Sequence, residues 1–305
     1  MREALRGRLR YDEPMSRHST WRVGGSADRY YEPAGKDDLC VFLASLPAGE
    51  PLTWVGLGSN LLVRDGGIHG TVVATAGALD AITRVSETEL DIEAGASCAR
   101  VARETARMGL TGAEYLAGIP GTIGGALAMN AGAHGVETWQ LVRAVETLNR
   151  AGAIQRRLPA DYRIGYRSVA GPPDEWFLAA RLALAPDEPS ACLARLREHL
   201  DHRARTQPVG KPSCGSVFRN PSGDFAARLI ESAGLKGSRS GGCHVSAKHA
   251  NFIINDNGAS AADIEALIER VQQTVLERHG VLLVPEVCIV GERTRKRPPP
   301  ARGSA

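Results

Sequence analysis

The chain has 305 residues, 43% of them hydrophobic and 23% charged, an ordinary composition for a soluble globular protein with room for two or three domains. Its net charge is only +3, and much of that charge lies in residues 292–297. The nearly neutral remainder argues against general nucleic-acid binding.

The terminal segments and the spacing of the cysteines indicate which kinds of protein remain possible. Residues 1–15 are charged and aperiodic, which predicts a flexible arm, and the basic, proline-rich residues 292–305 predict a disordered tail. The six cysteines show no CxxC spacing, which favours reduced thiols over a disulfide framework. No signal peptide and no apolar run of transmembrane length is present. We therefore expect a cytoplasmic protein without a membrane partner, and favour a monomer.

Hydrophobic periodicity from residue 19 to residue 185 predicts strands and helices that do not alternate regularly, and hence an α+β fold. The predicted helices cover 36–45 and 98–108. The predicted strands cover 52–55, 61–63, 71–75, 81–85, 89–94, 142–148, 154–158 and 176–184.

A glycine turn, Gly56-Leu57-Gly58-Ser59-Asn60, connects two of these strands. It lacks the third glycine of a dinucleotide fingerprint, and a strand follows it instead of a helix, so a Rossmann unit is not expected. Backbone amides at Gly58, Ser59 and Asn60 can still hold a phosphate, and the last two side chains can add hydrogen bonds. The alternative is an ordinary tight turn.

A second glycine-rich stretch covers residues 116–135, LAGIPGTIGGALAMNAGAHG. Glycine costs backbone entropy in a helix or a strand, so neither is expected throughout. The absence of Cβ atoms lets backbone amides approach a diphosphate or a large flat ligand. Two interpretations stay open from the stretch alone: a ligand cradle, and a crowded corner where two backbone segments cross.

Two proline-containing breaks, at 186–189 and 207–212, precede the last part of the chain. A helix capped by Ser190 is predicted to reach about Arg203 or Arg205. Beyond the second break we predict a helix over 225–233, a buried strand over 252–255 and an amphipathic helix over 260–279 that Gly280 ends.

Three polar residues are candidates for chemistry. Arg167 suits a carboxylate because its guanidinium binds two oxygens, although a surface strand arginine is the alternative. Ser216 follows small residues and could enter a pocket or simply form a turn; it is not in a Gly-x-Ser-x-Gly elbow, so serine hydrolysis is disfavoured. Glu286 is either a partly buried acid with a shifted pKa or a solvated turn residue.

Residues 242–252 place Cys243, His244 and His249 in a probable loop before a strand. Their spacing is weak support for a metal, so no metal is expected. Contacts to phosphate or sugar are favoured, with a plain loop–strand junction as the alternative.

Together, and in this order, the motifs resemble those of the bacterial UDP-N-acetylenolpyruvoylglucosamine reductase (MurB) family. They span about residues 18–291, and any one alone is weak. The motifs that carry the resemblance are TWRVGG at 20–25, GLGSNLLV at 56–63, the stretch 117–135, GYRS at 165–168, residues 212–221, 227–237 and 244–255, and PEV at 285–287.

The resemblance implies an α+β fold in which a two-subdomain FAD-binding module of the PCMH/VAO type precedes a smaller α+β substrate-binding domain. The expected units are an arm (1–15), FAD-binding subdomain 1 (16–76), FAD-binding subdomain 2 (77–205), the C-terminal domain (206–291) and the tail (292–305).

The resemblance also implies an activity. NADPH would reduce bound FAD, and flavin N5 would pass a hydride to the enolpyruvyl ether of a nucleotide sugar, giving UDP-N-acetylmuramate for peptidoglycan synthesis. Arg167 and Glu286 match the family's catalytic positions and would stabilise the enolic intermediate, while Ser216 would donate the proton.

Binding residues follow from the same motifs. The substrate contacts would be Tyr166, Asn220, Lys236 near the diphosphate, and His249. The FAD contacts would be Gly56, Gly58, Ser59, Asn60, Leu61, Ala117, Gly118, Ile119, Pro120, Gly121, Thr122, Gly124, Gly125, Asn130 and Ala131.

Two departures from the family pattern bear on the site. Cys288 stands where the family often has an arginine, so a second anion contact is missing or comes from elsewhere. The short spacing from Arg167 to Ser216 resembles the form of the family that lacks the loop whose tyrosine covers the substrate. The alternatives are another oxidoreductase of the same flavin-binding superfamily and a nucleotide-sugar-binding relative without catalysis.

Overall fold

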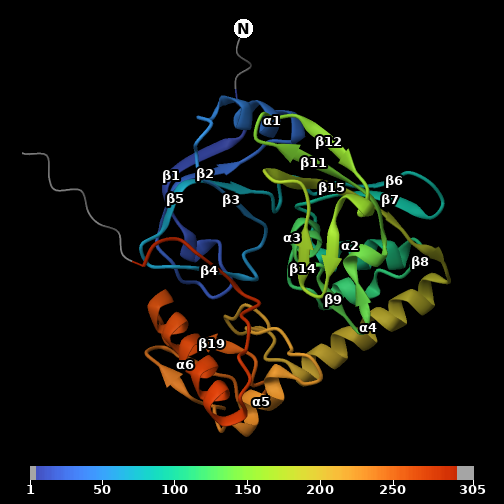
Figure 1. Cartoon of the computed structure of the whole chain (residues 1–305). Helices are drawn as coiled ribbons and strands as arrows, with labels where there is room; N and C mark the ends of the chain where they lie inside the picture. The colour runs from blue at the N-terminus through green and yellow to red at the C-terminus, as the bar shows by residue number, and fades with distance from the viewer. Residues whose placement is uncertain (1–4, 294–305) are drawn as a thin grey trace, which may run out of the picture.

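The computed structural model describes residues 5–293. Its first sheet consists of β1 (Arg8–Pro14), β2 (Ser26–Glu32), β5 (Ile68–Ala74) and β3 (Leu52–Val55), in that spatial order (Figure 1). Both β2 and β3 pair with β5 in parallel. Helix α1 (Lys36–Ser45) packs Leu39 and Phe42 against Tyr31 of this sheet.

The structure differs from the expected flexible arm at residues 1–15, because residues 8–14 form the edge strand β1, antiparallel to β2. Most side chains of β1 are exposed, so the strand lacks the alternating apolar pattern by which a sequence reveals a strand. Backbone pairing and the ion pair from Arg10 to Glu32 (2.7 Å) hold it instead. Residues 1–4 lie outside the described residues.

The second sheet consists of β12 (Ile154–Arg157), β11 (Val142–Asn149), β15 (Glu175–Ala183), β7 (Glu89–Glu93) and β6 (Ile82–Arg84), in that spatial order and antiparallel throughout. Helices α2 (Cys98–Arg107) and α3 (Ile123–Met129) pack on one face, where Val101 and Leu127 join the buried Ile92 and Val145 of the sheet. The predicted helix and strands of this region are therefore confirmed.

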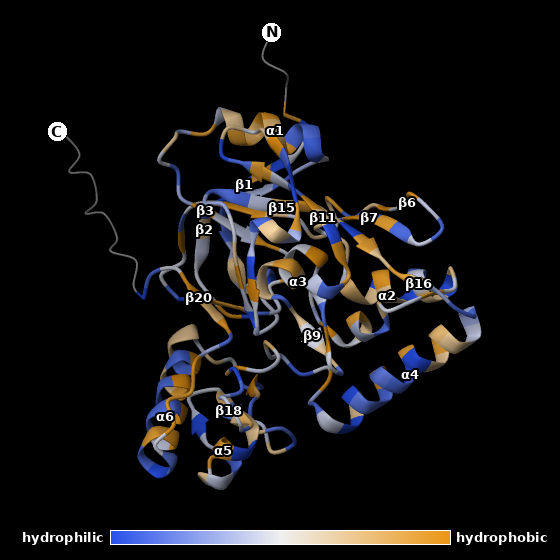
Figure 2. Ribbon diagram, turned by 45° about the vertical axis from the view of Figure 1, so that its right-hand side comes forward, coloured by the Kyte–Doolittle hydropathy of each residue, from blue (hydrophilic) through white to orange (hydrophobic). Residues whose placement is uncertain are grey.

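Helix α4 (Pro189–Thr206) reaches from the second sheet to the last part of the chain (Figure 1). There α5 (Ala226–Ser232) and α6 (Ala261–His279) share a core with β18 (Cys243–Val245) and β19 (Ile253–Asn255), and β17 (Arg239–Ser240) pairs with β18 at the edge. Figure 2 shows apolar residues along one side of α6, and Ile264, Leu267 and Val271 are buried there.

One strand ties this last part back to the first. The strand β20 (Cys288–Val290) pairs in parallel with β4 (Leu61–Val63), Cys288 lying opposite Leu61. Since Glu286 precedes β20 and the glycine turn precedes β4, the pairing brings these two segments together. The remaining short strands are β8 (Leu110–Thr111), β9 (Gly132–Ala133), β10 (Val136–Glu137), β13 (Arg163–Gly165), β14 (Ser168–Ala170) and β16 (Ala185–Pro186).

Local signals fix the ends of several helices. The bounds of α1 are those predicted, and α6 follows its N-cap Ser260, whose hydroxyl accepts a hydrogen bond from the Asp263 amide (3.1 Å). It ends at Gly280, whose φ is +67°. Helix α4 begins at Pro189, one residue before the predicted cap Ser190, because proline fits the first turn of a helix.

The predicted domain limits remain predictions, and some hydrophobic cores combine buried residues from two of the predicted domains. Trp21 and Leu62 belong to the core of the C-terminal part, and Leu148 packs beside α1. Of the predicted tail 292–305, Glu292 is bonded to the Gly67 carbonyl (3.0 Å), while residues 294–305 lie outside the described residues. In the part that the structure describes, no helix is long and apolar enough to cross a membrane.

Candidate functional site

Arg167 lies at the tip of the hairpin that β13 and β14 form. Its φ of +51° is left-handed, which costs a non-glycine residue about 1–2 kcal/mol. The guanidinium turns back into the protein and donates to the carbonyl oxygens of Gly132 (2.8 Å) and Asn130 (3.3 Å). Its side chain is only 18% exposed, so the structure does not support the interpretation as a surface strand arginine.

Glu286 is the ionic partner of Arg167. Nε of Arg167 lies 3.2 Å from Oε1 of Glu286, whose side chain is 19% exposed. Burial raises the pKa of Glu286 above its ordinary value, and the positive charges of Arg167 and Arg219 offset part of that shift. The carboxyl group therefore holds a proton more readily than an exposed glutamate, and a protonated carboxyl can donate a hydrogen bond.

The segment after Ser216 pairs with the segment that ends in Glu286. The Glu286 amide donates to the Val217 carbonyl (2.8 Å), and Phe218 forms a bridge with Pro285. Asn251 fixes this segment through its side chain, which accepts from the Phe218 amide (2.9 Å) and donates to the Phe218 carbonyl (2.8 Å). Glu286 thus contacts Arg167 through its side chain, and its backbone pairs with the segment that follows Ser216.

The two glycine-rich segments face each other, and their glycines divide into two groups. A Cβ at Gly56 would lie 2.4 Å from Thr122 Oγ1, and one at Gly58 would lie 1.9 Å from the His18 carbonyl oxygen. These glycines allow segments to cross. At Gly118 a Cβ would meet nothing within 4 Å, and at Gly121 only Ser59 Oγ at 3.4 Å. The crowded corner is therefore present at Gly56 and Gly58, whereas Gly118 and Gly121 face open space, and a ligand cradle there stays a prediction.

The turn before β4 presents unused donors. Within residues 5–293, the amides of residues 57–60 donate no hydrogen bond to the protein, and Gly58 has a φ of +61°. Successive unbonded amides around a left-handed residue form a concave site for an anion. In the facing stretch, by contrast, the amides of Gly121, Ile123 and Gly124 bond to carbonyl groups of the protein.

Several residues predicted to contact the cofactor are buried or form hydrogen bonds within the protein. The buried Asn130 donates from Nδ2 to Glu137 (2.7 Å) and to the Gly165 carbonyl (3.1 Å), and its Oδ1 accepts from the Trp139 amide (3.2 Å). Asn60 donates its side-chain amide to the Glu286 carbonyl (3.0 Å). Ala117 and Leu61 are in the core, and the Ala131 carbonyl accepts from Thr138.

Thr122 and Gly125 are joined at the start of α3, where Thr122 Oγ1 accepts from the Gly125 amide (3.4 Å). Ile119 packs against the core of the second sheet. Pro120 and Ser59 line a cavity of about 150 Å³ between the glycine segments and the C-terminal part. Arg203, Lys211 and Gly215 lie on its other sides.

Sequence reasoning missed Arg203. Its Nε donates to Gln207 (3.2 Å), and it has no acidic partner in residues 5–293. Burial lowers the pKa of its guanidinium, since no nearby carboxylate offsets the loss of hydration. An arginine without a counter-ion beside unbonded amides suits a diphosphate. Arg203 lies in the last turn of α4, and the sequence around it does not indicate that the side chain lines this cavity.

The predicted substrate residues lie around the C-terminal part and the hairpin tip. Tyr166 is half exposed, with the Arg167 guanidinium 5.0 Å from its ring centre. Asn220 Oδ1 accepts from the Ala226 amide (3.1 Å) at the start of α5. Lys236 pairs with Glu231 (2.6 Å), and burial, with a smaller effect of the Lys236 charge, lowers the pKa of His249.

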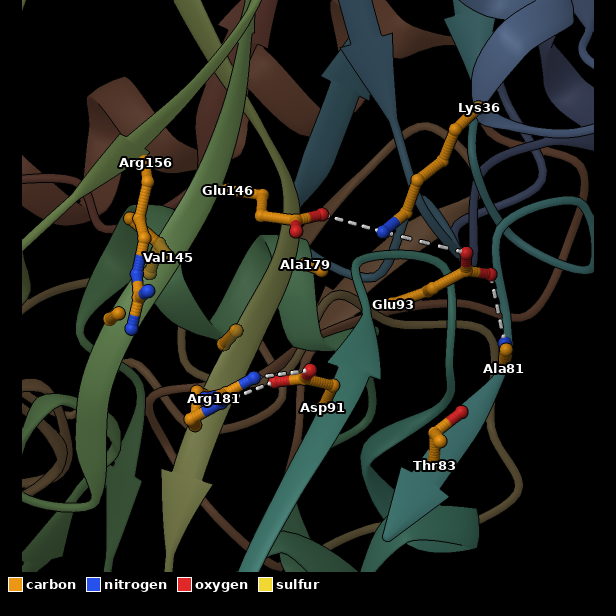
Figure 3. A pocket seen from close by; sticks show the side chains of 12 residues that line it. Lys36, Ala81, Thr83, Asp91, Glu93, Val145, Glu146, Arg156, Ala179 and Arg181 are labelled. Atoms are coloured by element: carbon orange, nitrogen blue, oxygen red, sulfur yellow. Dashed lines mark hydrogen bonds and ion pairs between the residues drawn. The ribbon is translucent and has the colours of Figure 1, made fainter. Parts of the chain in front are cut away.

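A separate hollow of about 270 Å³ lies on the open face of the second sheet (Figure 3). Lys36 reaches down between Glu146 (2.6 Å) and Glu93 (3.8 Å), and Arg181 lies along Asp91 (2.7 Å). Each of these carboxylates has a cationic partner, and no predicted site residue lines the hollow.

Comparison with known proteins agrees with this geometry. Residues 27–157 match the model of an FAD binding domain, and residues 207–290 match that of the UDP-N-acetylenolpyruvoylglucosamine reductase C-terminal domain. The protein of that name from Alkalilimnicola ehrlichii is 61% identical over 94% of this chain and 96% of its own length. The one from Legionella pneumophila (strain Corby) is 55% identical over 94% and 93%.

A solved structure supports the same conclusion for the fold. The crystal structure of UDP-N-acetylenolpyruvylglucosamine reductase (MurB) from Thermus caldophilus has a TM-score of 0.80 and 32% identity, covering 94% of this chain and 99% of that one. The expected α+β fold, an FAD-binding module followed by a MurB C-terminal domain, is therefore confirmed. The chain belongs to the UDP-N-acetylenolpyruvoylglucosamine reductase (MurB) family.

Proposed function

We propose that this protein reduces UDP-N-acetylenolpyruvoylglucosamine to UDP-N-acetylmuramate for peptidoglycan synthesis, with NADPH as reductant and FAD as bound cofactor. Beyond the family relationship, the observation that carries the proposal is the contact between the side chains of Arg167 and Glu286 beside the segment that begins at Ser216. A cation, a proton-holding carboxyl and a hydroxyl are the groups that reduction of an enol ether next to a carboxylate needs.

The residues present fit a cofactor with a diphosphate. The unbonded amides of residues 57–60 would hold phosphate oxygens, and the side chain of Arg203 would supply positive charge. The open space at Gly118 and Gly121 leaves room for the cofactor against the backbone. When bound, FAD supplies the hydride chemistry, which no side chain can perform.

The side chains would manage charge and protons on the substrate. Addition of a hydride to the terminal carbon of the enolpyruvyl group leaves negative charge on the neighbouring carbon and on its carboxylate. Arg167 stabilises that charge by its fixed guanidinium, and Glu286 in its protonated form donates a hydrogen bond. Ser216 then gives its hydroxyl proton to the neighbouring carbon, which completes the saturated ether, and regains a proton from water.

Ser216 is suited to this role in one respect. Its hydroxyl forms no hydrogen bond to the protein within residues 5–293, so the proton is not committed to another acceptor. The backbone that carries it is held by Asn251 and by the pairing with Glu286, which limits its motion. A serine is a weak acid, but a carbanion-like carbon is a strong base, and this makes the transfer favourable.

The test separates the two half-reactions. The purified protein should be yellow, and NADPH should bleach the flavin under anaerobic conditions. The enolpyruvyl substrate should restore the colour in the wild type but not in Ser216→Ala, whose bleaching by NADPH stays normal. A colourless protein that takes up no FAD would contradict the cofactor assignment, and a Ser216→Ala variant with normal reoxidation would contradict the proton donor.

The same assay decides between the proposal and the two alternatives. Another flavin oxidoreductase of this superfamily would bleach with a reductant, but the enolpyruvyl substrate would not restore its colour. A non-catalytic relative would bind the nucleotide sugar without any turnover. We further propose that the protein acts as a monomer in the cytoplasm, which light scattering and cell fractionation would test.

A further inference from the structure

Arg219 is a second guanidinium whose charge acts on Glu286, and its Nε has no hydrogen-bond partner within residues 5–293. Its Nε is buried, and no hydrogen-bond acceptor lies within reach among residues 5–293. A buried donor without an acceptor costs about 1–3 kcal/mol, and more when it is charged. A ligand that supplies the missing acceptor removes this cost when it binds, and the donor is already in position to receive it.

The backbone holds Arg219 close to the reacting groups. Its amide donates to the Val284 carbonyl (2.9 Å), next to the bridge between Phe218 and Pro285. The charge of Arg219 acts on Glu286 at this range, since it offsets part of the rise in the pKa of that carboxyl. Arg219 therefore belongs to the same small volume as Glu286, and Ser216 lies three residues before it.

Arg167 keeps two of its N–H groups for the substrate carboxylate, because groups of the protein take the other three. A guanidinium has five N–H donors. Arg167 gives one to Glu286, one to the Asn130 carbonyl and one to the Gly132 carbonyl. The carboxylate gains negative charge during the reaction, and one guanidinium balances only one charge, so a second cation with unused donors adds stabilisation.

We propose that Arg219 binds the carboxylate of the enolpyruvyl group, as the second cation of the site. With Glu286 protonated, the two guanidinium groups balance the two negative charges of the enediolate-like intermediate on the substrate. The carboxylate is attached to the carbon that Ser216 protonates, whereas the diphosphate lies across the sugar ring. Arg219 lies close to Glu286, so of the two anionic groups of the substrate it can reach the carboxylate and not the diphosphate.

The inference rests on the proposed function, and its test uses binding to the oxidised holoenzyme instead of turnover. UDP-N-acetylmuramate carries both the carboxylate and the diphosphate, while UDP-N-acetylglucosamine carries only the diphosphate. Arg219→Gln should weaken binding of the first about 10- to 100-fold, the loss expected for hydrogen bonds to a charged group. Binding of the second should stay within about twofold.

A conservative variant separates charge from geometry. Arg219→Lys keeps the charge but loses the planar fork, so its affinity for UDP-N-acetylmuramate should lie between those of wild type and Arg219→Gln. The midpoint that Glu286 contributes to the pH profile of binding should move upward in Arg219→Gln and stay in place in Arg219→Lys. Arg239→Gln, which removes an exposed arginine paired with Asp256 (3.1 Å), is the matched control.

Two results would overturn the inference. Equal losses for both ligands would assign Arg219 to the diphosphate, and unchanged binding of both would leave it without a ligand role. Should Arg219→Gln fail to fold, Arg219→Lys against the two ligands gives the same decision. Failure of the proposed function is distinguishable, because the wild-type flavin would then not be reoxidised by the enolpyruvyl substrate, whatever the Arg219 variants do.

Discussion

Asn130 offers a test of how the structure holds Arg167. Its side chain forms three hydrogen bonds, to Glu137 (2.7 Å), to the Gly165 carbonyl (3.1 Å) and from the Trp139 amide (3.2 Å). The bond to Gly165 fixes the hairpin whose tip carries Arg167, and an isolated two-stranded hairpin is marginally stable. Removing the side chain should therefore weaken both the fold and the position of Arg167.

The magnitude follows from the bonds and from the backbone. Three hydrogen bonds at about 1 kcal/mol each give a loss of about 3 kcal/mol in the free energy of unfolding. Asn130 has a φ of +44°, a conformation that asparagine and glycine tolerate and alanine does not, at about 1–2 kcal/mol. Asn130→Ala should therefore be less stable than Asn130→Gly by about 1 kcal/mol, although both lose the same three bonds.

Urea unfolding of the two variants measures the stability difference, and stopped-flow spectroscopy of the flavin measures the effect on function. In Asn130→Gly we expect reduction by NADPH to stay near the wild-type rate and reoxidation by the enolpyruvyl substrate to slow about tenfold or more, since a loosely held cation stabilises charge poorly. Asn149→Ala, which removes acceptors of the Ala151 and Ala153 amides at a distant turn, is the control. An Asn130→Ala variant as stable as Asn130→Gly, or equal slowing of both half-reactions, would show that Asn130 does not hold Arg167 in this way.

Three further predictions concern single residues of the site. Ser216→Cys should retain part of the reoxidation rate that Ser216→Ala loses, because a thiol also donates a proton, and stopped-flow traces of the two variants check this. Burial raises the pKa of Glu286 above 4.5, so the native state holds this proton to higher pH than the unfolded state does. The contribution of Glu286 to the free energy of unfolding therefore falls as the pH rises above 4.5. Between pH 5 and pH 8, the urea midpoint should fall less in Glu286→Gln than in wild type. Gly58→Ala should destabilise the apoprotein, because its Cβ would lie 1.9 Å from a carbonyl oxygen, whereas Gly118→Ala should leave apoprotein stability nearly unchanged and weaken FAD binding, measured by flavin fluorescence titration.

Features that depend on neighbouring residues could be predicted from the sequence. Capping by Ser260 and Gly280 sets the ends of α6, and the bounds of α1 follow from periodicity and Pro47. The order of the motifs along the chain was sufficient for the family. It also singled out Arg167, Ser216 and Glu286, because each residue type suits one step of the chemistry, although their roles stay predictions.

Which groups contact each other and which lack a hydrogen-bond partner depends on contacts between distant segments, which the sequence does not show. Asn130, predicted from its motif to contact the cofactor, uses its side chain inside the protein. The pairing of β20 with β4 brings Glu286 to Asn60, more than two hundred residues away in the sequence. Hydrogen-bond satisfaction depends on such long-range pairings, so no local pattern could show that the amides of 57–60 and Nε of Arg219 lack acceptors within residues 5–293.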